Sequence, residues 1–88
     1  MIAVKKVVLD VLKPHHPNAL EFCLALSAAI ENSTVKVNVI AVDEKTESLE
    51  VFVKAEIIDF DLIQGVINQM GGALHSIDAV VVRNEPDA

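Results

Sequence analysis

Apolar and polar residues alternate along three stretches of this 88-residue chain, residues 4–13, 34–42 and 49–57. A period of two is typical of a strand, because successive side chains of a strand point to opposite faces of its sheet. Residues 73–82 are predicted to form a last strand. The polar residues 43–48 have the length of an ordinary hairpin loop between the second and third strands.

Residues 19–31 are predicted to form an amphipathic helix, after a turn that Pro14 and Pro17 enclose. Asn18 is a suitable N-cap, and Glu21 follows three residues later, as in a capping box. The residues that recur at helical spacing, and that we expect on the buried stripe, are Leu20, Cys23, Leu24, Ser27 and Ile30.

A second helix is predicted from Asp61, which with Gln64 has the spacing of another capping box. Its apolar stripe is expected to consist of Leu62, Ile63, Val66, Ile67 and Met70. Gly71 is placed to end this helix in a left-handed conformation, which glycine adopts without steric cost.

The predicted order of elements is β-α-β-β-α-β. Right-handed crossovers then place both helices on one face of an antiparallel sheet with the strand order 4-1-3-2, which is the ferredoxin-like α+β sandwich. We expect residues 1–83 to form this single domain, and the polar residues 84–88 to form a flexible tail.

The alternation also assigns the strand residues to two faces of the sheet. The residues expected to face the helices are Val7, Leu9, Val11, Val35, Val37, Val39, Ala41, Leu49, Val51, Val53, Ile57, Ile77 and Val81. The residues expected on the opposite, open face are Val8, Leu12, Ile40, Val42, Phe52, Leu74, Val80 and Val82, with Asp10, Ser76 and Asp78 among them. An open face that is half apolar favours self-association through this face or the adjacent strand edges. The alternative is a set of scattered surface valines without a partner.

Charge and composition exclude several classes of function. Lys and Arg number 7 against 13 Asp and Glu, which gives a net charge of −6 and disfavours nucleic acid and anionic membranes as partners. No apolar run approaches the ~20 residues of a membrane span, and residues 1–6 do not resemble a signal peptide. One cysteine excludes an intramolecular disulfide. We therefore expect a cytoplasmic protein.

The predicted topology brings one group of polar residues to one end of the molecule, where the first strand ends and the last begins. They are Lys13, His15, His16, Asp43, Glu44, Glu47 and His75. Lys13, His15 and His75 are candidate ligand-binding residues, and the free N–H groups of the first helix are available there for a carboxylate. Histidines with carboxylates also suit a transition metal, although no His-Glu-x-x-His spacing is present. The alternative is a set of solvated and packed histidines.

A second group lies on the open face, where Asp10 on the first strand should lie near Ser76 and diagonal to Asp78. Carboxylates on an apolar face are costly unless they are paired, hydrated or bound to a cation. Their oxygen atoms make Ca²⁺ or Mg²⁺ the expected metal at Asp10, Ser76 and Asp78. The alternative is that both carboxylates are hydrated at a rim or hydrogen-bonded to a neighbouring subunit.

No motif for catalysis is present: the chain lacks a phosphate-binding glycine loop, a nucleophile elbow and a Cys-x-x-Cys pair. Cys23 is expected to be a small buried apolar residue. We therefore assign no catalytic residue and favour a non-enzymatic function. The enzymatic alternative is a site assembled between subunits with His75 as general base.

Two segments resemble the small archaeal family known as domain of unknown function 211. They are residues 8–15, Val-Leu-Asp-Val-Leu-Lys-Pro-His, and residues 71–78, Gly-Gly-Ala-Leu-His-Ser-Ile-Asp. The resemblance implies a single ferredoxin-like domain, a ring-like homo-oligomer and an archaeal, cytoplasmic setting, but no activity. His16 departs from the acidic residue that the resemblance leads us to expect, which weakens a metal site built on His15 and His16.

Two hypotheses of function follow. The first is a non-enzymatic homo-oligomeric domain, with itself as partner and with a divalent cation at Asp10 and Asp78. The second is a regulatory module, similar to amino-acid-sensing ferredoxin-like domains, that binds a small metabolite at a subunit interface near Lys13, His15 and His75.

Overall fold

A computed structural model describes residues 1–86 and contains six elements in the predicted order. The elements are β1 Ile2–Pro14, α1 Ala19–Ala29, β2 Thr34–Val42, β3 Thr46–Lys54, α2 Phe60–Gln69 and β4 Ala73–Asn84. The strand β2 has its predicted bounds, whereas β3 begins and ends three residues earlier than predicted. The predicted tail of residues 84–88 begins with the last residue of β4, and residues 87 and 88 lie outside the described residues.

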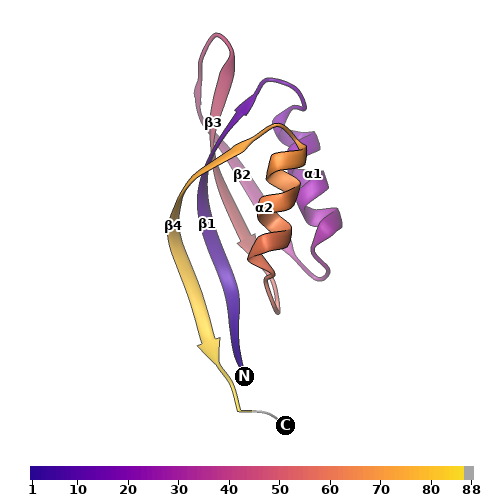
Figure 1. Cartoon of the computed structure of the whole chain (residues 1–88), viewed down its shortest axis with the longest axis vertical. Helices are drawn as coiled ribbons and strands as arrows, with labels where there is room; N and C mark the ends of the chain where they lie inside the picture. Colours follow the sequence, from indigo (N-terminus) through magenta and orange to yellow (C-terminus); the bar gives the residue numbers. More distant parts are fainter. Residues whose placement is uncertain (87–88) are drawn as a thin grey trace.

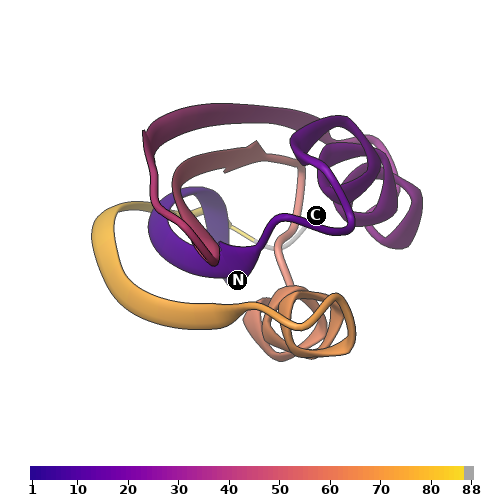
Figure 2. The ribbon, with the colours of Figure 1, turned by 90° about the horizontal axis from the view of Figure 1, so that it is seen from above.

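The four strands form one antiparallel sheet in the order β2-β3-β1-β4, which is the predicted order counted from the other edge. Both helices lie on the same side of this sheet (Figure 2). The fold is therefore the ferredoxin-like α+β sandwich. The opposite side of the sheet carries no element of the described chain, so it forms the open face.

The core lies between the helices and the middle of the sheet. Its buried apolar residues are Val7, Leu9, Val11, Phe22, Leu26, Ile30, Leu49, Val51, Val53, Ala55, Ile58, Ile63 and Ile67. The residues from β1 and β3 are those that the alternation assigns to the helix side. Each buried Val, Leu, Ile or Phe of this set stabilises the fold by about 1.5–3 kcal/mol relative to an exposed side chain.

The capping box of α1 is confirmed: the Asn18 side chain accepts from the Glu21 N–H at 2.8 Å, and Glu21 accepts from the Asn18 N–H. The predicted buried stripe is confirmed at Ile30 but wrong at Leu20 and Leu24, which are 68% and 61% exposed, while Phe22 and Leu26 are buried instead. Both sets recur every four residues. Because α1 is apolar around most of its circumference, the spacing alone does not determine which face is buried.

The start of α2 also differs from the prediction. Asp59, not Asp61, is the N-cap, and its side chain accepts from the Leu62 N–H at 3.3 Å. Ile63 and Ile67 are buried as predicted. Gly71 ends the helix with a φ of +79°, which confirms the predicted left-handed conformation.

Bulges in the β1–β4 ladder change which residues of β4 face the helices. The pairing passes from Asp10–Ser76 to Val11–Leu74 and so skips His75. The prediction placed Leu74 on the open face, but as a consequence of the bulge it packs against the core. A bulge adds one residue to one strand, so the alternation of that strand changes phase.

The helices are also shorter than the strands. The 11 residues of α1 span roughly 16 Å, whereas the 13 residues of β1 span roughly 43 Å. The molecule measures 51 × 22 × 17 Å, and the β2–β3 hairpin and the distant end of the β1–β4 pair extend past the helices (Figure 1). Neither helix of the described chain is long and apolar enough to span a membrane.

Register shifts and the outer position of β2 and β4 explain most of the further errors in the predicted core. The residues expected inward but found exposed are Val39, Ala41, Ile57, Ile77 and Val81. Val39 lies next to the hairpin on the outer strand β2, and the register shift after it pairs Ala41 with Ser48. On the outer strand β4, Ile77 lies opposite Leu9, and Val81 pairs with Lys6 on the open face. Ile57 follows the end of β3, and its neighbour Ile58 is buried instead and donates its N–H to the Val4 carbonyl at 2.9 Å.

Truncation of a side chain on the buried face of α1 should lower stability much more than truncation on its exposed face. Phe22→Ala removes a fully buried ring and should lower the free energy of unfolding by about 3–5 kcal/mol. Leu24→Ala, on the exposed face of the same helix, should change it by less than about 0.5 kcal/mol in dilute protein. Chemical denaturation of both variants measures the difference, and a larger loss for Leu24→Ala would contradict this packing of α1.

Candidate functional site

Lys13 is the one charged side chain that the described fold buries completely. It follows Val7, Leu9 and Val11 on the helix side of β1, so its ammonium reaches the end of the core. There it donates to the carbonyls of Pro14 at 2.8 Å and Pro17 at 2.5 Å, and it lies 3.0 Å from Glu47 Oε1. The two carbonyls accept hydrogen bonds from the ammonium, and Glu47 Oε1 is its ion-pair partner.

His15 extends this cluster to the β2–β3 hairpin. Its Nδ1 donates to Glu47 Oε2 at 3.2 Å, and its Nε2 donates to the Glu44 carbonyl at 3.0 Å. Both partners are acceptors, and only the doubly protonated imidazole can donate to both. The hydrogen bond to Glu47, followed by that to the Glu44 carbonyl, accordingly raises the pKa of His15.

Glu47 joins the two cations. The hydrogen bond from Lys13, and secondarily that from His15, holds the pKa of the Glu47 carboxyl below its ordinary value. We refer to Lys13, His15 and Glu47 as the clasp, because they connect the loop after β1 to the first turn of β3. Since both cations of the clasp already donate to protein atoms, a ligand would have to displace Glu47 to bind them.

The structure does not bring His75 to the clasp. Its Nδ1 lies 3.2 Å from Asp10 Oδ2, and its side chain is 77% exposed. The three residues predicted to share one ligand therefore divide between two places, with Lys13 and His15 at the clasp and His75 beside Asp10. The bulge at His75 accounts for this, because it places His75 beside Ser76 opposite Asp10.

The open-face candidates lie around this Asp10–His75 pair. Asp10 is the register partner of Ser76, and the Ser76 hydroxyl donates to Asp78 Oδ1 at 2.7 Å. A hollow of about 200 Å³ is lined by Asp10, Leu12, Ser48 and His75. This volume is below the ~300 Å³ at which small-molecule sites begin, and the exposed imidazole is open to water.

A metal at these positions has few ligands from one copy. The described residues contain no group of three or more His, Cys, Asp or Glu side chains that could hold a metal ion. One oxygen of Asp10 is near His75, and one oxygen of Asp78 accepts from Ser76. The cation at Asp10, Ser76 and Asp78 stays a prediction, and it requires ligands beyond those that one described chain brings together.

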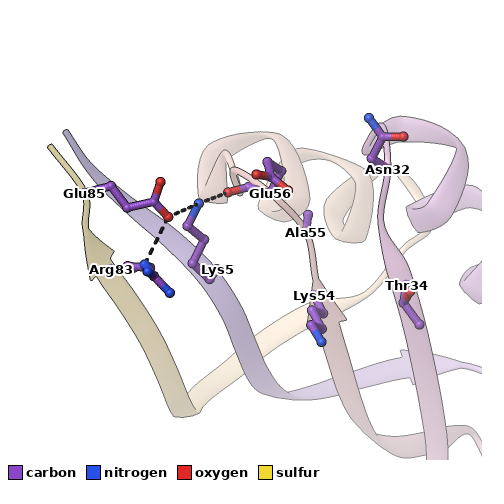
Figure 3. A pocket seen from close by; sticks show the side chains of 8 residues that line it. All are labelled: Lys5, Asn32, Thr34, Lys54, Ala55, Glu56, Arg83 and Glu85. Atoms are coloured by element: carbon purple, nitrogen blue, oxygen red, sulfur yellow. Dashed lines mark hydrogen bonds and ion pairs between the residues drawn. The ribbon is translucent and has the colours of Figure 1, made fainter. Parts of the chain in front are cut away.

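A larger hollow of about 390 Å³ lies at the opposite end of the sheet. It is lined by Lys5, Asn32, Thr34, Lys54, Ala55, Glu56, Arg83 and Glu85 (Figure 3). Lys5 donates to the Glu56 carbonyl at 2.6 Å, and Glu85 Oε1 lies 3.4 Å from Lys5 and 3.1 Å from Arg83. Sequence reasoning missed this hollow, because its charged residues come from distant segments without a recognisable spacing.

The contacts in this hollow connect three segments of the fold to one another. Glu85 neutralises two cations of the β1–β4 pair, and Lys5 fastens that pair to the segment after β3. Lys54 lies across the hollow and has no acidic partner in the described chain (Figure 3). The hollow therefore carries a small excess of positive charge on an otherwise acidic protein.

Comparison with known proteins identifies the family of this chain. A family model, DUF211, described as uncharacterized ArCR, matches residues 5–85. The uncharacterized protein MJ0319 of Methanocaldococcus jannaschii is 38% identical over 81 residues, which cover 92% of this chain and 84% of that protein. The chain therefore belongs to the DUF211 family, as the two segments around Asp10 and His75 indicate.

The clasp should make stability depend on pH in a defined window. The pKa of His15 is raised above its ordinary 6.5, so its contribution is complete below about pH 6.5 and is lost as pH rises through the folded-state pKa. The pKa of Glu47 is lowered from 4.5, so its contribution is present above about pH 4.5 and is lost as pH falls through the folded-state pKa.

We therefore expect His15→Gln to lower the melting temperature most between about pH 4.5 and 6.5, and least near pH 9. Differential scanning calorimetry across this range measures the effect. His16→Gln, which alters the exposed neighbouring histidine, is the matched control and should follow the wild-type profile. An equal loss for His15→Gln at every pH would show that the charge on His15 is not what stabilises the hairpin.

Removal of the buried ammonium should destabilise the fold more than removal of an exposed one. Lys13→Met leaves two carbonyls and a carboxylate oxygen without their donor, whereas Lys45→Met alters an exposed residue of the hairpin loop. The melting temperature should fall for the first variant and stay near that of the wild type for the second. The double variant Lys13→Met/Glu47→Met should regain part of the loss, because it also removes the unpaired carboxylate.

Proposed function

We propose that this member of the DUF211 family is a non-enzymatic subunit of a homo-oligomer, in which the outer strands β2 and β4 of neighbouring copies pair with each other. The observation that carries the proposal is the state of these two strands. Each has a single neighbour in the described sheet, β3 for β2 and β1 for β4, so its outer N–H and C=O groups face away from the sheet. Such an edge is a template for pairing with another chain.

The exposed large apolar side chains gather on the same two strands. On β2 they are Val39, Ile40 and Val42, and on β4 they are Ile77, Val80, Val81 and Val82. Ile40 is 63% exposed beside the β2–β3 hairpin, and Val80 is 55% exposed on the outer strand β4 opposite the core residue Val7. Proteins that stay monomeric protect their edge strands with charge, proline, short length or bulges. Bulges interrupt β2 at Ile40 and β4 at His75 and Asp78, but neither strand is short and neither contains proline.

The directions of the strands favour a head-to-tail arrangement. Each strand of the sheet is antiparallel to its neighbour, so β2 and β4 run in opposite directions. Copies that face the same way therefore place β4 of one antiparallel to β2 of the next, and the hydrogen-bonding pattern of the sheet continues across the boundary. A heterologous contact of this kind forms a ring where its rotation closes.

The contacts at the polar candidates support an assembly role over a catalytic or a sensing role. Lys13 and His15 donate to protein acceptors, and the hollow at His75 is small. A metabolite carboxylate that bound at the clasp would have to break the ion pairs of Glu47 with Lys13 and His15. The regulatory module and the cation at Asp10 and Asp78 stay predictions, which thermal-shift titration with amino acids and CaCl₂ would test.

The edge proposal predicts how single charges change the mass of the protein in solution. Light scattering after size exclusion should give a multiple of the chain mass of 9.5 kDa for the wild type. Ile40→Lys and Val80→Lys each place a charge on one of the two edges and should lower this mass. Leu24→Lys, on the exposed face of α1, is the matched control and should keep it.

Two results would contradict the proposal. One is a wild-type protein that has the mass of a single chain at micromolar concentration. The other is an unchanged mass for both edge variants while the protein still associates, which would place the contact elsewhere.

A further inference from the structure

The open face of the sheet carries its charges in ordered rows. Three successive rows of register partners cross all four strands, from β2 through β3 and β1 to β4. The basic row consists of Thr34, Lys54, Lys6 and Val81. The middle row consists of Lys36, Phe52, Val8 and Ala79. The acidic row consists of Asn38, Glu50, Asp10 and Ser76.

The two outer rows each contain a pair of like charges. Lys54 and Lys6 are direct partners in the β1–β3 ladder, and so are Glu50 and Asp10. Like charges directly opposite each other on one face of a sheet are destabilising. A single copy therefore has two repulsive pairs on the two inner strands of its open face.

These charges form no ion pair with Lys, Arg, Asp or Glu within the described chain. The ion pairs among residues 1–86 that involve lysine or arginine use Lys5, Lys13 and Arg83, and none includes Lys6 or Lys54. Asp10 contacts His75, and Glu50 accepts from Asn38 at 3.4 Å. The open face therefore presents two lysines and two carboxylates that can still form salt bridges.

The rows are placed symmetrically about Phe52 and Val8. Each outer row is two residues along the strand from the middle row, which is roughly 7 Å. A two-fold axis that lies along the middle row, between two stacked faces, exchanges the outer rows and keeps each strand over its equivalent. Lys54 then lies over Glu50 of the partner subunit, and Lys6 lies over Asp10 of the partner subunit.

We propose that the open face binds a second copy of this chain face to face, about a two-fold axis along the middle row. Both like-charge pairs are then covered by a pair of opposite charge, and Phe52 meets Phe52 of the partner subunit at the centre. A second copy is the partner that fits, because the same face carries both members of each complementary pair, as an isologous contact requires. Lysine chains are long enough to cross the ~10 Å between stacked sheets.

The middle row is compatible with this arrangement. Lys36 lies with its ammonium 5.3 Å from the centre of the Phe52 ring, as in a cation–π contact. On the axis it faces its own equivalent, but it belongs to the outer strand β2 and is exposed, so solvent screens that repulsion. Val8 is already nearly buried by its neighbours.

The sharpest experiment exchanges charges between the rows. Lys54→Glu and Glu50→Lys should each weaken the face-to-face pair, because each leaves like charges facing each other across the axis. We expect the dissociation constant to rise at least about 100-fold for each variant. The double variant Lys54→Glu/Glu50→Lys exchanges the two charges within β3 and should restore association.

Mixing the two single variants provides a second, independent readout. The Lys54→Glu chain has two acidic positions on β3 and the Glu50→Lys chain has two basic ones, so the mixture should form a heterodimer although neither chain pairs with itself. Unfolding cannot explain the expected losses. Each single variant changes a like-charge partner pair of the β1–β3 ladder into a pair of opposite charge, which favours the folded chain.

The measurement is separated from the edge-strand proposal by working in an Ile40→Lys/Val80→Lys background, in which the edges are blocked. There, light scattering should give twice the chain mass of 9.5 kDa, and the single charge variants should return it to one chain mass. Failure of edge pairing alone would leave this dimer intact. Unchanged masses for both single variants, or no heterodimer in the mixture, would overturn the face-to-face contact.

A different occupant of the face would give a different result. If the blocked-edge protein is a single chain whose melting temperature rises with pyrophosphate in a Lys6- and Lys54-dependent manner, the face binds an anion and the proposal is wrong.

Discussion

The difference in length between the strands and the helices determines which surfaces this fold leaves open. Helices of 11 and 10 residues cover only the middle of a sheet whose strands reach 13 residues, because a helix advances less than half as far per residue as a strand. The core is correspondingly restricted to the residues under the helices. The apolar residues next to the β2–β3 hairpin lie where the sheet extends past the helices, and those of β4 lie on an outer strand, so both places carry exposed apolar surface.

The clasp marks the point at which the covered part of β1 ends. At this boundary the side chain of Lys13 still points to the helix side. A lysine suits this position because its apolar stem packs in the core while its ammonium reaches the rim. The two proline carbonyls accept its hydrogen bonds and Glu47 is its ion-pair partner, while His15 contacts both this carboxylate and the Glu44 carbonyl of the hairpin. The cluster thus connects the hairpin to the core, while a ligand at Lys13 and His15 stays a prediction.

The sequence predicts the order of the elements and the topology because period and capping residues are local signals. It does not predict the phase of α1, since an Ala-rich helix offers two apolar stripes of equal spacing and only the packed partner selects Phe22. Nor does it reveal the bulges of β4, because no residue type marks them and each shifts the alternation. The topology is enough to place Asp10 opposite Ser76. The separation of His75 from Lys13 depends on a bulge, so it could not be predicted from the sequence.

The net charge of −6 makes association of identical copies costly unless their contact surfaces are locally neutral. The exposed apolar stretches of β2 and β4 carry little charge, and the three central rows of the open face hold three lysines against two carboxylates. Like charges lie side by side in two of these rows, which destabilises the isolated chain. Exchange of one lysine for a glutamate would remove one of these repulsions, so selection for stability alone would not keep them. A second copy removes that cost without any such exchange, because stacking about the middle row turns each repulsive pair into half of a neutral group of four. The distribution of charge on this face is therefore better explained by what it contacts than by what it contributes to the isolated fold.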